Sequence, residues 1–138
     1  MIFRNLKKSD YSQYLNLLSQ LTTVKKSDID KFNNFVNNLP ENHIVQVYEL
    51  NNKIVACGTI FIEQKVIHDM GKVGHIEDIV VDKESRGKKL GLKLIKHLEN
   101  IGKTKGCYKI ILDCDVKNIK FYEKCGFIEK GVEMAKYF

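Results

Sequence analysis

Two acidic residues, Glu77 and Asp78, lie inside an apolar, largely β-branched run that predicts a buried strand over residues 73–81. A third acid, Asp113, lies in the next such run, residues 108–114. A buried carboxylate is costly unless it is paired or hydrogen-bonded, so these acids either cap loops and pair with lysines or carry chemistry. Adjacent strand residues point to opposite faces, so Glu77 and Asp78 reach one pocket only if the strand contains a bulge. Three acids on two neighbouring central strands favour a functional role.

The strand is followed by a basic, glycine-containing loop, residues 86–91, that precedes an amphipathic helical pattern. Two of its six positions are glycine and three are basic. Free backbone N–H groups at a helix start carry a partial positive charge of about +0.5 and bind phosphate readily. The alternative is a tight turn on a solvated basic face. The phosphate-binding P-loop frame is absent, so any anion site here is of another kind.

Tyr122 lies in the pattern Asn118-x-x-x-Tyr122-x-x-x-Gly126, on a short helix predicted over residues 119–125. Its ring can pack with Phe121 on the core face of that helix. Alternatively, its hydroxyl can serve as a proton donor near the strand ends. The residues alone leave both roles open.

Metal and nucleophile chemistry find little support in the sequence. The histidines and acids between residues 68 and 78 fit no standard zinc spacing, and we expect no metal. No G-x-S-x-G elbow is present. The cysteines show no C-x-x-C spacing and are expected to be small buried hydrophobes in a reducing compartment. They are Cys57, Cys107, Cys114 and Cys125.

The 138 residues carry a net charge of +6, with 43% apolar and 29% charged residues, which is ordinary for a single domain spanning residues 1–138. The positive charge predicts an anionic partner: a nucleic acid, an anionic membrane or a phosphorylated small molecule. The strands lack interleaved aromatic and basic residues, which argues against RNA. The sequence has no apolar run of about eighteen residues and no apolar signal core, so we expect a cytoplasmic location.

The periodicity of apolar residues predicts a mixed, mostly antiparallel sheet with helices on both faces and one parallel crossover between residues 73 and 114. The asparagine pair at 51–52 predicts a type I′ hairpin turn because asparagine tolerates positive φ. Ser27 and Pro40 are expected to begin and close the second helix. The expected strands are residues 2–6, 43–50, 53–62, 73–81 and 108–114, the expected helices begin near residues 11, 28, 90 and 119, and a final hairpin is expected at 127–138.

The loop at residues 86–91, the helix after it, the short strand and the N-x-x-x-Y-x-x-x-G-F pattern resemble the GNAT acetyltransferase superfamily. Lys89 stands where that loop motif has its middle glycine. Three blocks, residues 74–81, 106–114 and 118–127, are more closely similar to the glucosamine-6-phosphate N-acetyltransferase family within the superfamily. The resemblance implies an α/β (α+β) GNAT fold, with a mixed, mostly antiparallel central sheet of six to seven strands flanked by about four helices.

The resemblance implies acetyl-CoA as donor, D-glucosamine 6-phosphate as acceptor, and a homodimer whose site the partner subunit completes, with no metal, nucleic acid or membrane involved. By position it gives Tyr122 the role of protonating the thiolate, and we add Glu77 and Asp113 as candidate catalytic residues. The acetyl-CoA side would be Ile79, Val80, Val81, Arg86, Gly87, Lys88, Lys89, Leu90, Gly91, Leu92, Asn118, Tyr122 and Lys124. The sugar-phosphate side would be Thr22, Lys65, His68, Glu77, Asp78, Tyr108, Lys109 and Asp113. Where the family often has a basic residue near the C-terminus, this chain has Tyr137, with Lys136 as the substitute.

We expect the amine to attack the thioester directly within a ternary complex, with Glu77 or Asp113 relaying the proton. A backbone N–H near Ile79 would polarise the carbonyl, and Tyr122 would protonate the departing thiolate. No acetyl-cysteine intermediate is expected. Two alternatives stay open: a GNAT enzyme that acetylates another amine, and a non-enzymatic basic module that binds RNA or senses CoA.

Overall fold

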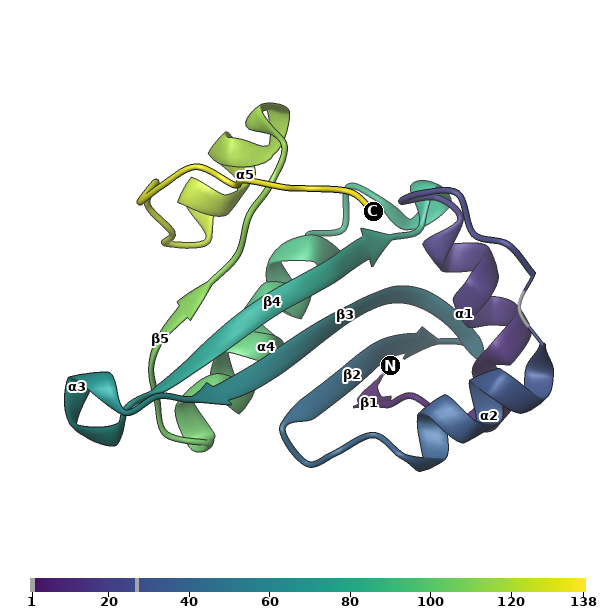
Figure 1. The fold of residues 1–138 in the computed structure, drawn as a ribbon. Helices are drawn as coiled ribbons and strands as arrows, with labels where there is room; N and C mark the ends of the chain where they lie inside the picture. Colours follow the sequence, from purple (N-terminus) through teal and green to yellow (C-terminus); the bar gives the residue numbers. More distant parts are fainter. Residues whose placement is uncertain (1, 27) are drawn as a thin grey trace.

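The computed structural model describes residues 2–26 and 28–138, and its strands form one five-stranded sheet (Figure 1). All neighbouring strands are antiparallel except β4 and β5, which are parallel. The mixed, mostly antiparallel sheet is therefore confirmed, while the expectation of six to seven strands was wrong. In spatial order the strands are β1 (Ile2–Asn5), β2 (His43–Leu50), β3 (Lys53–Gln64), β4 (Lys72–Val81) and β5 (Cys107–Ile111).

The described ranges also contain five helices and three short 3-10 turns. The last turn and the last helix follow the final strand. Helix α4 makes the expected parallel crossover from β4 to β5. The helices are α1 (Tyr11–Leu18), α2 (Ile29–Asn37), α3 (Ile67–Met70), α4 (Leu90–Thr104) and α5 (Ile119–Lys124); the turns are η1 (Lys8–Asp10), η2 (Lys83–Ser85) and η3 (Val116–Asn118). None of these helices is both long and apolar enough to cross a membrane.

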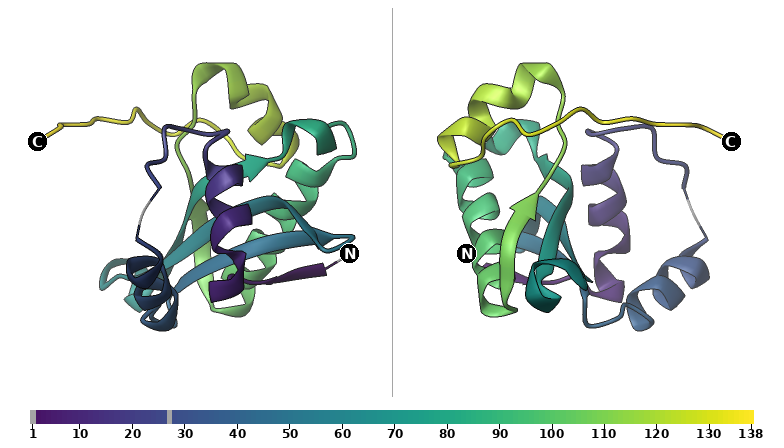
Figure 2. Two further views of the ribbon diagram at one scale, coloured as in Figure 1. Left: turned by 90° about the vertical axis from the view of Figure 1, so that its right-hand side faces the viewer. Right: turned by 60° about the vertical axis from the view of Figure 1, so that its left-hand side comes forward.

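Helix α4 covers one face of the sheet, and α1 covers the opposite face (Figure 2). On its face, α4 buries Leu94, Ile95 and Leu98 completely against Ile60 and Ile76 of the sheet. Each fully buried aliphatic side chain of this kind stabilises the fold by about 1.5–3 kcal/mol relative to exposure. The apolar content of both faces of residues 73–81 correctly predicted coverage from both sides.

The core of the second face is formed by α1 and α2. Tyr14 and Leu17 of α1 and Phe32 of α2 pack with Val47 and Cys57 of the sheet. This cluster includes residues of β2, β3 and β4 but none of β5. The α1 side of the sheet is therefore covered unevenly.

The hairpin between β2 and β3 confirms the turn predicted for the asparagine pair. Asn51 and Asn52 have φ angles of 50° and 61°, and Leu50 pairs with Lys53 across the turn. These are the positive φ angles that a type I′ turn requires.

The final hairpin predicted for residues 127–138 was wrong. In the structure this segment forms no helix or strand, and Figure 2 shows it as an extended tail that leaves the body of the molecule. Val132 and Met134 are 87% and 90% exposed. A two-stranded hairpin is marginal in water unless it packs against other structure, and these side chains have no such support within the described chain.

Three element boundaries also differ from expectation. The pattern at the start of α1 extended to residue 21, but the helix ends at Leu18. Asp28 caps α2 by accepting a hydrogen bond from the backbone N–H of Asp30, and the expected cap, Ser27, lies outside the described residues. Strand β5 ends at Ile111 rather than at residue 114.

Candidate active site

Strand β4 contains a β-bulge at Asp78. Between the pairs Thr59–Glu77 and Cys57–Val80, strand β3 has one residue and β4 has two. Asp78 is the first of those two and has a φ of 53°, in the left-handed region that most residues avoid. The extra residue is the irregularity that two adjacent acids need in order to serve one site.

The bulge brings the acids into one group on the α1 side of the sheet. Burial raises the pKa of the Tyr14 hydroxyl on α1, and the nearby Asp78 carboxylate adds to that rise. The Glu77 side chain is accessible to solvent, but the protein around it removes part of its hydration, and this desolvation raises its pKa. The negative charges of Asp113 and Asp78 raise the pKa of Glu77 further. Asp78 and Asp113 therefore both act on Glu77.

This arrangement corrects one expectation. The acids were placed in buried strands, whereas all three are exposed in the single chain, and Asp113 lies two residues beyond the end of β5. Glu133, in the C-terminal tail, also contributes to the raised pKa of Glu77. Glu133 could not be expected from the sequence, because no local pattern indicates where the tail runs.

Gly58 is a second residue that the sequence analysis missed. It lies on β3 opposite the bulge, where a Cβ atom would come within 2.5 Å of Ile79 and 3.0 Å of Leu98. Glycine is therefore what allows Ile79 to pack between β3 and α4. A glycine inside a strand pattern often marks a bulge or a close approach, so a signal was present.

The parallel ladder between β4 and β5 stops halfway along β4, at the pair His75–Ile111. The backbone of Ile79, Val80 and Val81 lies beyond that point, with no partner in β5. An unpaired strand edge can bind an extended ligand through main-chain hydrogen bonds.

The basic loop that follows contains two residues with positive φ angles. Gly87 has φ 88°, and Lys89 has φ 58° at the residue immediately before α4. Lys89, the departure from the loop motif, thus adopts the backbone conformation that glycine adopts most easily. The loop side chains Arg86, Lys88 and Lys89 are exposed.

The first turn of α4 contributes Leu90, Gly91 and Leu92. Leu90 is buried in the core, and Leu92 is partly buried. A Cβ atom on Gly91 would lie 3.0 Å from the ring of Phe121, so glycine here allows α5 to approach the start of α4. This approach brings α5 next to the basic loop.

Tyr122 lies on α5, with its ring packed edge-on against Phe121 and Phe127 at centroid distances of 5.0 and 6.1 Å. Burial raises the pKa of its hydroxyl to about 12, so the hydroxyl stays protonated at neutral pH. The ring therefore packs with Phe121, as one of the two expected roles requires. The hydroxyl also keeps the proton that the other role, proton donation, requires. Asn118 and Lys124, at the two ends of α5, are exposed.

Four residues expected around the sugar phosphate gather at the turn between β3 and β4. The His68 ring lies against Tyr108 in a tilted arrangement with 4.6 Å between ring centroids, and the Nζ atom of Lys109 lies 5.6 Å from the centre of the same Tyr108 ring. Lys65 is paired with Glu63 at 3.2 Å. His68 and the two residues after it all have positive φ angles, near 55°.

This group is separated from the acids within one chain. Lys109 of this group pairs with Val73 of β4, and Glu77 is four residues further along that strand. At about 3.3 Å per residue, that separation is roughly 13 Å. Thr22, the remaining expected sugar contact, is exposed in the connection between α1 and α2.

The cysteines are all free, but only Cys57 is fully buried, and Cys114 is exposed, against expectation. Desolvation raises the pKa of each thiol. For the buried Cys57 it raises the pKa to about 12. A raised pKa leaves little thiolate for nucleophilic attack at neutral pH. In residues 2–26 and 28–138 no three His, Cys, Asp or Glu side chains are grouped to hold a metal ion.

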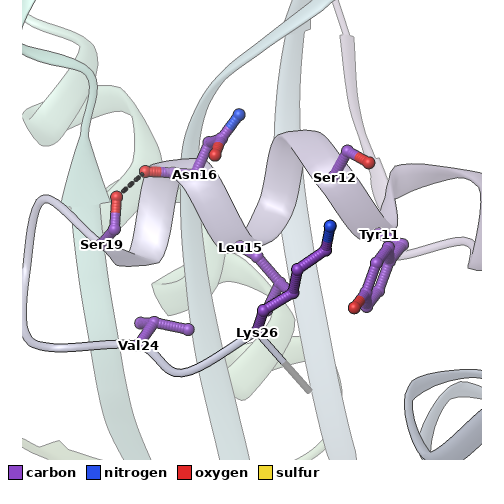
Figure 3. Close-up of a pocket in the computed structure, with 7 residues that line it drawn as sticks. All are labelled: Tyr11, Ser12, Leu15, Asn16, Ser19, Val24 and Lys26. Atoms are coloured by element: carbon purple, nitrogen blue, oxygen red, sulfur yellow. Dashed lines mark hydrogen bonds between the residues drawn. The ribbon is translucent and has the colours of Figure 1, made fainter. Parts of the chain in front are cut away.

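Two surface hollows lie along α1. The hollow drawn in Figure 3 measures about 340 Å³ and the other about 220 Å³. Neither is lined by a residue of the expected site. The first is lined by Tyr11, Ser12, Leu15, Asn16, Ser19, Val24 and Lys26, and the second by Gln13, Asn16, Leu17, Gln20, Lys53, Ile54 and Asp82.

Comparison with known proteins identifies the family. Residues 6–127 match the model of the Acetyltransferase (GNAT) family. The glucosamine 6-phosphate N-acetyltransferase of Candida albicans is 47% identical over 96% of this chain and 93% of its own length. Glucosamine 6-phosphate N-acetyltransferase 1 of Dictyostelium discoideum is 47% identical over 92% of this chain and 82% of its own length.

A solved structure agrees with the sequence relatives. The crystal structure of glucosamine-6-phosphate N-acetyltransferase from Arabidopsis thaliana superimposes with a TM-score of 0.95 at 41% identity, covering 99% of this chain and 97% of that one. The relatives by sequence and the solved structure thus carry the same enzyme name, and the solved structure has the fold of this chain. The chain belongs to the GNAT acetyltransferase family.

Proposed function

We propose that the protein transfers the acetyl group of acetyl-CoA to the amine of D-glucosamine 6-phosphate, giving N-acetyl-D-glucosamine 6-phosphate and CoA. The names of relatives at 43–47% identity support this acceptor. The observation that carries the proposal is the bulge at Asp78, which joins an acidic group on the α1 face of β4 to the open backbone edge that β4 presents toward β5. The domain is residues 1–138, since the two cores draw on elements from both ends of the chain.

The acidic group is the amine side of the site. Carboxylates attract the ammonium form of the acceptor, and a partly desolvated Glu77 with a raised pKa is a better base than an ordinary glutamate. An amine with a pKa near ~8 is already partly neutral at pH 7, so a weak base is sufficient. Glu77 takes the proton directly or through water, and Asp113 tunes Glu77.

The basic loop and the free edge of β4 are the donor side. The loop N–H groups and the exposed bases of residues 86–91 suit the pyrophosphate of CoA, and the backbone of Ile79 to Val81 suits the extended pantetheine arm. Asn118 and Lys124 lie at the two ends of α5 for further contacts with CoA. With both substrates bound, the amine nitrogen attacks the thioester carbon, the C–S bond breaks, and Tyr122 donates its proton to the thiolate.

A homodimer completes the site in this proposal. A hexose phosphate is shorter than the roughly 13 Å of strand between Glu77 and Val73, the partner of Lys109, so the group around Tyr108 reaches the acceptor from a second copy. The side of the sheet that α1 and α2 leave uncovered is partly apolar, with Phe61 38% and Ile111 41% exposed. An apolar surface next to the acids is a suitable contact for a partner subunit.

A thiol-release assay with acetyl-CoA tests the acceptor. D-glucosamine 6-phosphate is compared with unphosphorylated glucosamine and with a lysine-containing peptide. We expect rapid CoA release with the phosphorylated sugar and at least about 100-fold lower kcat/KM without the phosphate, since charge-assisted bonds to the phosphate are lost. Acetylation of the peptide but not of the sugar phosphate would overturn the acceptor, and CoA binding without transfer to any amine would indicate a binding module.

Complementation tests the shared site. Glu77→Gln disables the acidic group, and Lys109→Ala disables the group at the turn. If the site is shared, mixed dimers contain one site with both defects and one with neither, so mixing two inactive variants restores activity. A mixture that stays inactive, although the two variants exchange subunits, contradicts a shared site.

A further inference from the structure

The side chain of Gln20 joins the two halves of the proposed site. Its Nε2 donates a hydrogen bond to Oδ1 of Asp82 at 2.9 Å, and its Oε1 accepts one from the backbone N–H of Lys83, also at 2.9 Å. Gln20 lies just after α1, two residues before Thr22. Asp82 and Lys83 lie between β4 and the basic loop. One amide therefore links the segment leading to the acceptor side with the segment leading to the donor side.

Asp82 is itself firmly held. It is 5% exposed, and its Oδ2 accepts from the Nζ of Lys53 at 3.1 Å and from the hydroxyl of Ser85 at 3.5 Å. Its backbone N–H donates to the carbonyl of Val55 at 2.8 Å. The hydrogen bond from Gln20 lowers the pKa of the Asp82 carboxyl, as does the pairing with Lys53, so this carboxylate is ionised at neutral pH.

The bonds constrain the start of the loop directly. Lys83 begins η2, which ends at Ser85, next to Arg86. Because the N–H of Lys83 is held by Gln20, η2 cannot shift along the end of β4 without breaking that bond. The positions of the loop N–H groups thus depend on a residue 63 positions earlier in the chain.

We propose that Gln20 is a positioning residue for acetyl transfer: by bonding Asp82 and Lys83 together, it fixes the donor loop relative to the acceptor segment around Thr22. This role rests on the proposed function of both segments. Gln20 touches neither substrate in this account. It acts through the geometry of the segments it joins, where a small misplacement of reacting groups has large effects on rate.

Gln13 is a matched control. It is the same residue type on α1, and its Oε1 accepts one hydrogen bond from the backbone N–H of Ile54 at 2.9 Å. That bond joins α1 to β3 but reaches neither segment of the site. Gln20→Leu removes the bonds from the residue just after α1 to Asp82 and Lys83, and Gln13→Leu removes the bond from α1 to Ile54. Only Gln20→Leu therefore releases the loop.

The first readout is CoA binding by calorimetry, without any acceptor. We expect Gln20→Leu to weaken CoA binding by about tenfold, the size of one lost hydrogen bond to a charged group, and Gln13→Leu to stay within about twofold of wild type. This comparison stands even if the acceptor is another amine. Failure of wild type to bind CoA would instead refute the proposed function.

The second readout is the pH dependence of Gln20→Glu. The new carboxylate faces that of Asp82 at neutral pH, and on protonation it can again donate to Asp82. We expect the kcat/KM ratio of variant to wild type to rise several-fold between pH 8 and pH 5.5. A flat ratio, or equal CoA affinities of Gln20→Leu and Gln13→Leu, overturns the role of Gln20.

Discussion

The two halves of β4 differ in regularity, and the difference separates structural support from chemistry. From Lys72 to Ile76 the strand pairs with β3 without interruption and buries Val73 and Ile76, and as far as His75 it also pairs with β5. From Glu77 to Val81 it is bulged and has no partner in β5. The regular half supports the fold. The irregular half presents acids on the α1 face of the sheet and an unpaired backbone edge toward β5.

The irregular half has an energetic cost. A non-glycine residue in the left-handed conformation costs about 1–2 kcal/mol, and Asp78 adopts it in the middle of a strand. Such outliers persist when the surrounding structure enforces them, and they cluster at functional sites. Here Gly58, opposite the bulge, removes the Cβ that would otherwise collide with Ile79.

Loss of the Tyr122 hydroxyl should produce the largest effect at the irregular half. Without the acid, Tyr122→Phe should lower kcat by about 100-fold with little change in stability, because general acid catalysis contributes 10²–10⁴-fold. Steady-state kinetics and a thermal melt measure the two quantities. The control is Tyr48→Phe, since the buried Tyr48 hydroxyl lacks a hydrogen-bond partner among the described residues. Equal kcat values for Tyr122→Phe and wild type from pH 6 to 9 would remove Tyr122 from the chemistry.

A matched pair of glycine substitutions compares the two halves directly. Gly58→Val inserts side-chain atoms against Ile79 and Leu98, while Gly74→Val, in the regular half, inserts them against Ile60 and Ile110. Both should destabilise the fold by about 1–3 kcal/mol, as overpacking does. Only Gly58→Val should also lower kcat/KM of the folded enzyme, by about tenfold. Equal losses of activity in both variants would show that the bulge has no special role.

Lys89 gives a smaller effect of opposite sign. Glycine adopts φ near 58° with less strain, so Lys89→Gly should raise the free energy of unfolding by up to about 1 kcal/mol. Chemical denaturation measures the change. Lys88→Gly, one residue earlier and without a positive φ, is the control and should not stabilise the protein. Equal shifts in both variants would argue against strain at Lys89.

The smallest effect is expected at His97 on α4, beneath the regular part of the sheet. His97 stacks on Phe3 and hydrogen-bonds Gln46 at 2.8 Å, and burial lowers its pKa. The folded state therefore favours neutral His97, so its contribution to stability is present above the unfolded pKa of about 6.5 and is lost as pH falls below it. Denaturation at pH 7.5 and 5.5 should show this loss in wild type and a weaker one in His97→Gln.

Local patterns predicted the regular parts of the fold. The asparagine pair correctly predicted the hairpin turn. Apolar periodicity predicted the start of α4 at Leu90 and both ends of β4 to within one residue. The sequence showed only that a bulge was needed if Glu77 and Asp78 were to share a pocket. Whether a residue is extra depends on the pairing with the neighbouring strand, which the sequence alone does not show. The contacts of Gln20 with Asp82, 62 residues away, and the position of Glu133 depend on tertiary packing that no local pattern encodes. The predicted final hairpin failed because alternation alone does not supply a surface for a strand to pack on.

The pH dependence of kcat in wild type and Asp113→Asn tests the central claim most directly, that the bulge assembles one acidic group that acts as the base. Glu77 must be ionised to accept a proton, so kcat falls as pH drops through its raised pKa. Removing the charge of Asp113 leaves the effect of desolvation but lowers the pKa of Glu77. The acid limb of the profile is therefore predicted to move to lower pH in Asp113→Asn and to be absent from the residual activity of Glu77→Gln. An acid limb at the same pH in all three proteins would contradict the account.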